Sequence, residues 1–360
     1  MPSSRFRRAR GASRVVAAAM LAALLASCGG NGGKIGVSLI LKTQSNPYFV
    51  SMKQAAETQA GQSGVHLSVA TGNADGDTQT QINAIDTAIA RGDKGILITS
   101  NGPAVNAALR LAKQYGLFVI ALDTPLDPSN TADVTYATNN FEAGKLIGQY
   151  AAERLAGKKA VIAMLDLYND QVVSVDVDRD HGFLTGMGID PGSTTLNAQE
   201  ATTGKYTGGK GGSYQIACHQ ATQGAVDGGR TAMEQCLSRN PAINVVYTIN
   251  EPAGEGAYAA LTAAKLQDKA FIVSIDGSCQ GMSDIEKGIF AADATQYPGK
   301  MAQLGVTAVK QVGQGGHAPS LPPGKNYLDT GTKLVTAKPL PGVKSQTVAE
   351  GKQACWGTAQ

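Results

Sequence analysis

The sequence predicts an α/β protein made of two doubly wound, parallel-sheet lobes joined by a multi-strand hinge. Short apolar, β-branched segments alternate with amphipathic helical segments through most of the 360 residues. This alternation is typical of a parallel sheet covered by helices on both faces. The pattern is complete in the first third of the chain and is then repeated, and the length is sufficient for two domains, each with its own core.

The first α/β unit occupies the N-terminal third of the chain. Strands are expected at residues 34–41, 65–70, 95–100 and 117–122, and helices at 47–61, 78–91 and 103–115. Asn46 is a good N-cap residue and Pro47 suits the first position of a helix. Apolar residues recur at helical spacing from Ile82 to Ile89, and Gly92 ends that helix.

The second α/β unit follows in series. Strands are expected at 160–165, 213–218, 243–249, 270–276 and 290–295, and helices at 141–155, 179–187, 227–237, 252–264, 282–287 and 298–312. Glycine and proline cluster at 313–324, which indicates a surface connection. Residues 327–340 are interpreted as one or two strands that cross back between the units. We therefore assign 34–138 with 297–329 to an N-terminal lobe, and 139–296 with 330–360 to a C-terminal lobe.

The N-terminus has the layout of a secretory signal. Five arginines between Arg5 and Arg14 precede an apolar segment at 15–26, and small residues come just before Cys28. The ending Leu-Ala-Ser-Cys resembles the lipobox of bacterial lipoproteins, in which the cysteine is lipidated. We expect a signal peptide at 1–27, a lipidated Cys28, a flexible tether at 28–33 and an extracytoplasmic, membrane-anchored location. An ordinary signal cleaved nearby and a short membrane anchor are the alternatives.

Composition excludes some classes of partner. The first 27 residues carry five of the 31 basic residues and none of the 28 acidic ones, so residues 28–360 have a net charge of −2. No basic face therefore favours a nucleic-acid partner. No later segment approaches about 18 uninterrupted apolar residues, so we expect no further membrane span.

Four further cysteines remain in an exported chain: Cys218, Cys236, Cys279 and Cys355. An even number in an oxidising compartment indicates disulfides, for which three connectivities are possible. We favour Cys218–Cys236, which links a strand to the next helix, and Cys279–Cys355, which ties the C-terminal tail to a loop. A metal site is disfavoured because no CxxC spacing or histidine pair is present. Residues 74–77 resemble a fragment of a calcium loop without its remaining ligands, and we expect a loop with a helix cap there.

Polar and aromatic side chains directly follow the predicted strands. They are Asn46, Tyr48, Phe49, Asp123, Asn250, Asp276 and Gln296. In open parallel sheets ligands bind beyond the carboxyl ends of the strands. Carboxylates and amides together can satisfy a ring of hydroxyl groups, and aromatic rings can cover the C–H faces of a sugar. The set contains no nucleophile–base pair, so it indicates a binding site for a neutral sugar or polyol and not an enzyme.

Several segments, taken in this order, resemble the ribose-type family of periplasmic sugar-binding proteins that serve ABC importers. They read KIGVSLILKTQSNPYFVSMKQAAE, VIALDTP, VVYTINEPAGEGAYAAL, IVSIDGSCQGM and ATQYPGKMAQLG. The resemblance covers nearly all of residues 34–360. The fructose-binding branch is similar at YNDQVVSVDVDRDHGFLTGMGI, YTINEP and the terminal ACWG.

The resemblance implies sugar contacts at the seven residues named above and at an arginine of the second lobe. That arginine falls on Arg179, although the register leaves Asp176 and Asp178 as alternatives. Two departures argue against ribose itself. Thr124 follows Asp123 where ribose binders have an arginine, and residues 219–224 replace an aromatic residue. His219 and Lys42 are further candidates to shape the pocket.

We therefore expect a monomeric solute-binding lipoprotein without a cofactor or a bound metal. It captures fructose or a related monosaccharide between its lobes and delivers it to the subunits of an ABC permease. A receptor that presents the sugar to a membrane signalling protein is the principal alternative. The effector domain of a LacI-like regulator has the same fold, but residues 1–33 offer a signal where a helix-turn-helix is needed.

Overall fold

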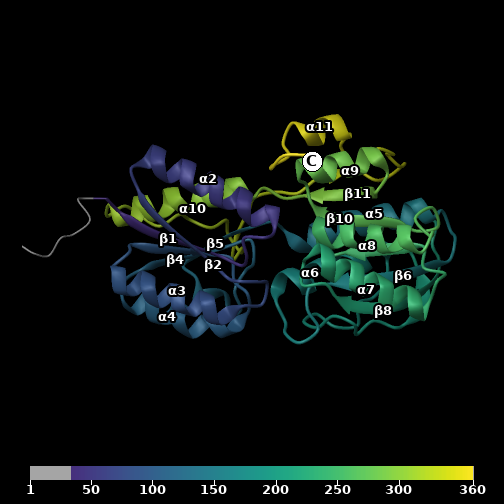
Figure 1. The fold of residues 1–360 in the computed structure, drawn as a ribbon, viewed down its shortest axis with the longest axis horizontal. Helices are drawn as coiled ribbons and strands as arrows, with labels where there is room; N and C mark the ends of the chain where they lie inside the picture. The colour runs from purple at the N-terminus through teal and green to yellow at the C-terminus, as the bar shows by residue number, and fades with distance from the viewer. Residues whose placement is uncertain (1–33, 360) are drawn as a thin grey trace, which may run out of the picture. The chain divides into compact units, whose positions relative to one another are not determined.

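Two sheets with helices on both faces make up the part of the chain that this computed structural model describes, residues 34–359 (Figure 1). The signal peptide, Cys28 and the tether at 28–33 that the sequence predicts lie outside the described residues. The first sheet with its helices is called the first lobe below, and the second sheet with its helices the second lobe.

The first sheet is parallel throughout, in the strand order β12-β5-β4-β3-β1-β2. Its strands are β1 (Gly36–Leu41), β2 (His66–Thr71), β3 (Gly95–Ile98), β4 (Phe118–Leu122), β5 (Val134–Ala137) and β12 (Leu328–Asp329). Its helices are α2 (Pro47–Ser63), α3 (Thr78–Arg91), α4 (Asn106–Gln114) and α10 (Pro298–Gly313), with short 3-10 turns at Pro103–Val105 and Ser129–Thr131. Helices α2 and α10 pack together on one face, and α3 and α4 cover the other.

The second sheet has the order β13-β11-β10-β9-β6-β8-β7, and only its two edge strands run antiparallel to their neighbours. Its strands are β6 (Ala160–Asp166), β7 (Thr203–Tyr206), β8 (Gly212–Ala221), β9 (Val245–Thr248), β10 (Phe271–Asp276), β11 (Phe290–Thr295) and β13 (Leu334–Val335). Its helices are α5 (Asn140–Leu155), α6 (Ser174–Met187), α7 (Val226–Arg239), α8 (Glu251–Ala263), α9 (Cys279–Lys287) and α11 (Val348–Lys352). The two α/β units are thus the parallel-sheet lobes that the alternating pattern predicts.

Helices α5 and α6 lie in close contact because glycines line their interface. A Cβ atom on Gly144 would collide with the carbonyl oxygen of Arg179, and one on Gly182 would collide with that of Phe141. The two backbones can therefore approach more closely than larger side chains would permit. This contact fixes the position of the helix that carries Arg179.

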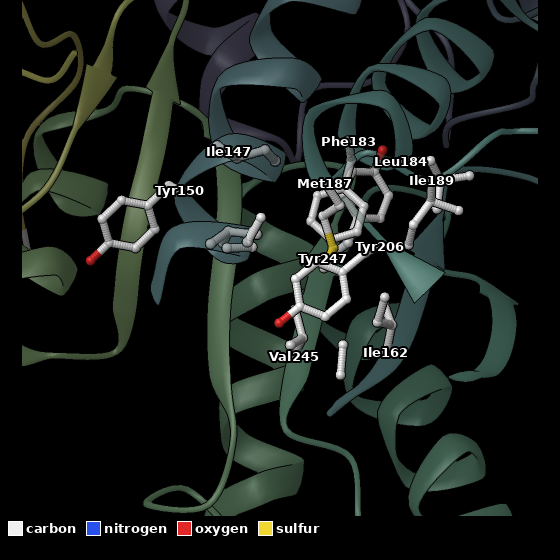
Figure 2. Close-up of a cluster of buried hydrophobic side chains, with 14 of the residues drawn as sticks. Ile147, Tyr150, Ile162, Phe183, Leu184, Met187, Ile189, Tyr206, Val245 and Tyr247 are labelled. Carbon is white, nitrogen blue, oxygen red and sulfur yellow. The ribbon is translucent and has the colours of Figure 1, made fainter. Parts of the chain in front are cut away.

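One core of the second lobe lies between its sheet and the α5–α6 pair (Figure 2), and another lies between the sheet and α7, α8 and α9. The rings of Phe183 and Tyr247 are 5.1 Å apart, and Tyr206 is 1 % exposed. Aromatic side chains of this size bury large apolar areas, which stabilise the lobe. This packing holds the sheet against α5 and α6, the helices that carry Asn140 and Arg179.

Three short segments connect the two sheets. They lie between β5 and α5, between β11 and α10, and between β12 and β13. The returning segment at 327–340 supplies one short strand to each sheet, which confirms the predicted return strands. We propose the lobe boundaries 34–138 with 297–329 and 139–296 with 330–360 on this basis.

Four elements differ from the sequence-based prediction. Helix α6 begins at Ser174 and not at Arg179, because three aspartates with low helix propensity obscure its first turns. Strand β5, the four residues VTYA, was not predicted. Strand β7 was missed because it is a mostly exposed edge strand, and the five-residue helix α11 begins with a capping box at Thr347 and Glu350.

Candidate functional site

One cavity brings together all eight residues that the sequence predicts to contact a ligand. They are Asn46, Tyr48, Phe49, Asp123, Arg179, Asn250, Asp276 and Gln296. Five further residues line it: Lys42, Asp75, Leu167, Val175 and Ile249. The space between these side chains, counted with its opening to solvent, is about 370 Å³. Both lobes contribute, mainly from the carboxyl ends of their strands, where ligands bind in open α/β sheets.

Asp123 lies directly after β4 and is held by two hydroxyl groups. Tyr48 donates to its Oδ1 and Thr124 to its Oδ2, each at 2.9 Å. The backbone of Asp123 has φ +64°, in the left-handed region that aspartate tolerates better than most residues. Such strain persists where the surrounding structure fixes it and is often found at functional sites. The carboxylate is thereby presented to the cavity as an oriented acceptor.

Asn46 caps a helix, as its sequence position predicts, and it also lies at the cavity. Its Oδ1 accepts a hydrogen bond from the backbone N–H of Tyr48 at 2.9 Å and so caps α2. The residue also lines the cavity. Next to it, the rings of Tyr48 and Phe49 meet edge to face with centroids 5.3 Å apart. The start of α2 therefore gives the cavity one amide and two aromatic rings.

Two nitrogens of the Arg179 guanidinium donate hydrogen bonds to neighbouring groups of the second lobe. Its Nε donates to Asn140 Oδ1 at 2.9 Å, and its Nη1 donates to the carbonyl oxygen of Ile249 at 2.6 Å. Gln296 Nε2 also donates to Asn140 Oδ1, at 3.2 Å, while the buried Gln296 Oε1 has no partner among the described residues. Asn140, which sequence reasoning missed, thus orients both a charged donor and an amide at the cavity.

The register of the second-lobe arginine is clear from this placement. Asp176 points away from the cavity, and its carboxylate accepts hydrogen bonds from the backbone N–H groups of Leu167 and Tyr168 at 2.8 and 3.1 Å. Asp178 is partly exposed and does not line the cavity. Arg179, and neither aspartate, lies at the candidate site.

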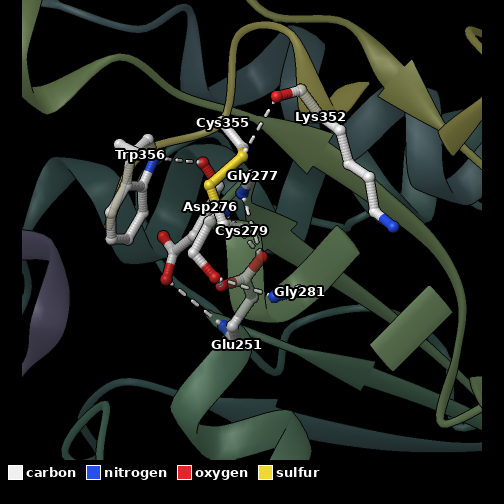
Figure 3. Close-up of a disulfide and its surroundings, with 9 residues drawn as sticks. Glu251, Asp276, Gly277, Cys279, Gly281, Lys352, Cys355 and Trp356 are labelled. Atoms are coloured by element: carbon white, nitrogen blue, oxygen red, sulfur yellow. Dashed lines mark hydrogen bonds between the residues drawn. A yellow bond between two sulfur atoms is a disulfide. The ribbon is translucent and has the colours of Figure 1, made fainter. Parts of the chain in front are cut away.

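Asp276 lies at the end of β10 and is almost completely buried (Figure 3). Burial is the main cause that raises the pKa of Asp276 well above its ordinary value. The neighbouring Glu251 carboxyl raises this pKa further, and the Arg179 guanidinium lowers it. Asp276 Oδ2 accepts a hydrogen bond from the backbone N–H of Glu251 at 3.4 Å. The carboxyl is therefore shielded from bulk water, and a hydrogen bond to a ligand is stronger there than in solution.

Asn250 serves mainly to build the site. Its Oδ1 accepts from the backbone N–H of Ala253 at 3.1 Å, which caps α8, and its Nδ2 donates to the carbonyl oxygen of Gly224 at 3.0 Å. Residues 219–224, where the resemblance implies an aromatic residue, thus reach the site only through the backbone of Gly224. His219 was expected to shape the pocket, and it does not line it, because β8 places its side chain against Asp166 and Glu200.

Lys42 and Asp75 add a charged pair to the wall of the cavity. Lys42 Nζ lies 4.0 Å from Asp75 Oδ1, and both side chains are buried. Burial raises the pKa of Asp75, and Lys42 opposes this shift. Asp75 was missed because the sequence favours a simple helix cap at 74–77, and Asp77 does cap α3 by accepting from the N–H of Thr80 at 3.1 Å.

The C-terminal tail reaches the same site through a disulfide (Figure 3). The two disulfides are Cys218–Cys236 and Cys279–Cys355, the pairing that we favoured. Trp356 Nε1 donates to the carbonyl oxygen of Asp276 at 3.2 Å, and its ring lies 5.4 Å from that of Tyr48. Trp356 was missed as a neighbour of the site, although ACWG is part of the resemblance.

Within residues 34–359 none of the helices has the length and apolar character needed to cross a membrane. The chain is 25% identical over 280 residues to the ribose import binding protein of Salmonella typhimurium, which covers 78% of this chain and 85% of that protein. It is 23% identical over 281 residues to the D-allose-binding periplasmic protein of Escherichia coli, covering 76% and 82%.

A solved structure has the same architecture. A protein from Mycobacterium smegmatis in complex with β-D-fucofuranose superimposes with a TM-score of 0.71, at 21% identity, over 89% of this chain and 93% of that one. The family model for the periplasmic binding protein domain matches residues 35–317, which is most of the sequence. The chain therefore belongs to the periplasmic binding protein family.

Proposed function

We propose that this protein binds a monosaccharide, fructose or a related sugar, between its two lobes and delivers it to an ABC permease. The convergence of Asp123, Arg179, Asp276 and Gln296 on one cavity is the observation that carries the proposal. Charged acceptors and a charged donor form strong hydrogen bonds with hydroxyl groups. A site of this kind rejects analogues that lack a hydroxyl, because a buried polar group is then left unpaired.

The known relatives support a sugar as the ligand. The names of the relatives above give ribose for one protein and D-allose for another. Identity of 25% or less does not transfer either sugar to this chain. Thr124 supplies a hydroxyl donor beside Asp123 where the resemblance to ribose binders implies a guanidinium. Fructose is preferred because the segments YNDQVVSVDVDRDHGFLTGMGI, YTINEP and ACWG resemble the fructose-binding branch.

The proposal is one of binding without turnover, outside the cytoplasm. Among the described residues, the side chains that line the cavity include no serine, cysteine or histidine, so they offer no activated nucleophile of these types. The predicted signal and lipidated Cys28 would hold a monomeric receptor at the outer face of a membrane, close to its permease. Closure of the lobes on the sugar would create the form that the permease recognises.

A sugar-binding screen tests the proposal. The protein lacking residues 1–27 is titrated with fructose, ribose, allose and other neutral sugars by calorimetry and thermal shift. We expect one sugar to bind at one site and to raise the Tm with its concentration. Asp123→Asn removes a charged hydrogen-bond partner, worth about 1.5–3 kcal/mol, so affinity should fall about 10- to 150-fold. Asp276→Asn replaces a carboxyl whose neutral form burial favours, so the loss should be about 0.5–1.5 kcal/mol, or about 2- to 10-fold.

The matched control is Asp86→Asn, which changes an exposed aspartate on α3 and should leave affinity unchanged. Both site variants must keep the Tm of the sugar-free protein within a few degrees, which separates binding from folding. Wild-type affinity in both site variants would refute the assignment of the cavity, and the absence of any sugar-dependent shift would refute the ligand class. Loss of sugar uptake on deletion of the gene would support transport over sensing.

A further inference from the structure

A second group of polar side chains lies in the second lobe, outside the candidate sugar site. Asp166 ends β6, Asp180 is in α6, and His219 is near the end of β8. Glu200, from the segment that precedes β7, completes the group. The proposed sugar-binding function uses none of these four residues.

Three of these side chains present ligand atoms to a common point. Single donor atoms of Asp166, Asp180 and His219 all lie within 4.8 Å of one another. His219 Nδ1 is 2.7 Å from Asp166 Oδ2 and 4.0 Å from Asp180 Oδ2. Ligands about 2.0–2.2 Å from one ion lie about 3–4 Å apart, so the 4.0 Å separation fits as it stands, and the 2.7 Å pair must move slightly apart when an ion enters.

Asp180 is an independent indication that a cation belongs here. Its side chain is fully buried, and neither of its oxygens has a hydrogen-bond partner in the described part of the chain. One oxygen of Asp166 and one of Glu200 are also buried without a partner. Buried carboxylates are normally paired, hydrogen-bonded or bound to a metal.

An ion-pair network without a metal leaves both oxygens of Asp180 without a hydrogen bond from any described residue. A doubly protonated His219 would satisfy Asp166 and Glu200, which lie 2.7 and 2.8 Å from its two ring nitrogens. It would leave Asp180 beyond hydrogen-bond distance at 4.0 Å. It would also place three buried carboxyl groups around a single imidazolium.

Glu200 occupies the position of an outer-shell partner. Its Oε1 lies 2.8 Å from His219 Nε2 and can accept the proton of that nitrogen. The lone pair of Nδ1 then faces Asp166 and Asp180. A carboxylate that orients a histidine in this way is a regular companion of metal-bound imidazole.

We propose that Asp166, Asp180 and His219 bind a divalent transition-metal ion, with Glu200 orienting the histidine. One imidazole with two carboxylates suits Zn²⁺ or Mn²⁺, whereas Ca²⁺ and Mg²⁺ prefer oxygen ligands only. A cavity of about 910 Å³, counted with its opening to solvent, adjoins the site and is lined by Asp166 and His219. This cavity provides a path of entry and room for water in the remaining coordination positions.

The bound ion would join three elements of the second lobe, β6, α6 and β8. Because α6 also carries Arg179, the ion would stabilise the wall of the sugar site from behind. The site is therefore expected to be structural, and it should form without any sugar.

Metal binding is tested on the tag-free protein lacking residues 1–27, after treatment with EDTA and in the absence of sugar. Zn²⁺ and Mn²⁺ are titrated by calorimetry, and the metal that remains after dialysis is measured by mass spectrometry. We expect one equivalent of at least one of the two ions and a higher Tm with that ion. Glu200→Gln should weaken binding about 10- to 100-fold. Asp180→Asn and His219→Gln should weaken it more.

His66→Gln is the control for adventitious binding, because His66 is exposed in the first lobe and should not affect the affinity. Fructose or any other sugar found to bind serves as the test of folding in each variant. Wild-type protein that binds neither ion in stoichiometric amount would overturn the proposal. So would an Asp180→Asn variant that binds as tightly as wild type, and both readouts are independent of the sugar.

Discussion

Buried carboxyl groups dominate the candidate site at the scale of single residues. Asp276, at the end of β10, and Glu251, at the start of α8, are neighbours. Burial raises the pKa of each carboxyl well above its ordinary value. Glu251 is held by the backbone N–H groups of Gly277 and Ser278 at 3.1 and 3.0 Å (Figure 3). Burial of carboxyl groups is costly, and carboxyl groups with strongly raised pKa values are concentrated at functional sites.

Glu255, one turn further along α8, provides a test of this electrostatic description. Burial, followed by the nearby Asp284 carboxyl, raises the pKa of Glu255 from 4.5 to about 7. Between about pH 4.5 and about pH 7, the folded protein therefore binds more protons than the unfolded chain. Its stability falls as the pH rises through this range. Glu255→Gln cannot ionise and should escape this loss.

We therefore expect Glu255→Gln to raise the Tm relative to wild type at pH 8, with little difference at pH 4.5. Thermal unfolding of both proteins across this range measures the effect. The exposed Glu57→Gln in α2 is the control and should show no such dependence. A Tm difference that does not change with pH would contradict the raised pKa.

The residues that the strand pattern could identify are those that follow a strand, whereas Arg179, inside α6, was identified only through the family resemblance. Asp123 and Asp276 each come directly after an apolar strand, and parallel strands bring such positions to one edge. Asn140 and Trp356 follow no predicted strand. They reach the site through a helix start and a disulfide-bound tail, and no local pattern indicates which distant residue such segments approach.

At the scale of elements, the α5–α6 contact decides where Arg179 lies. The sequence shows glycines at 144 and 182, but only the structure shows that they face each other's backbones. By helix propensity alone, both glycines are expected to destabilise their helices. Reliance on helix propensity also made the predicted α6 too short. In the structure, packing against α5 overrides the low helix propensity of the α6 aspartates.

Gly144→Ala tests this contact. The added Cβ would collide with the carbonyl oxygen of Arg179, so the helices must separate. We expect a loss of about 1–3 kcal/mol in the free energy of unfolding, as is typical of overpacking. Displacement of Arg179 should weaken sugar binding as well. Urea unfolding and calorimetry measure the two effects.

Gly61→Ala in α2 is the matched control. A Cβ at this position has no neighbour within 4 Å, so the substitution should stabilise the protein by about 0.5–1 kcal/mol through helix propensity. Equal effects of the two substitutions would show that Gly144 is not needed for close packing.

At the scale of the whole molecule, direct contacts join the lobes beside the cavity. Ser174 Oγ donates to the carbonyl oxygen of Pro125 at 2.7 Å, and the Tyr168 hydroxyl donates to Asp75 Oδ1 at 3.4 Å. Neither Ser174 nor Pro125 lines the cavity. The Ser174–Pro125 hydrogen bond can exist only while the lobes are close together, so in the proposed closure it would favour the closed form without touching the ligand.

Ser174→Ala should therefore weaken sugar binding from a distance. The apparent Kd is the intrinsic Kd divided by the fraction of molecules competent to bind, so a smaller closed fraction raises it. Loss of one hydrogen bond, worth about 0.5–1.5 kcal/mol, corresponds to a Kd about 2- to 10-fold higher. Stopped-flow fluorescence of Trp356, the one tryptophan of the chain, should show the change mainly in the dissociation rate.

Ser238→Ala is the control, since its hydroxyl donates only within α7, to the carbonyl oxygen of Gln235 at 2.8 Å. It should leave both rate constants unchanged. If Ser174→Ala binds like wild type, the Ser174–Pro125 contact does not bias closure, and the balance between the open and closed forms then depends on the ligand itself. If the two substitutions weaken binding equally, the effect is not specific to the contact between the lobes. A selective increase in the dissociation rate would instead show that the Ser174–Pro125 hydrogen bond stabilises the closed form, and so raises the affinity for a sugar that Ser174 does not contact.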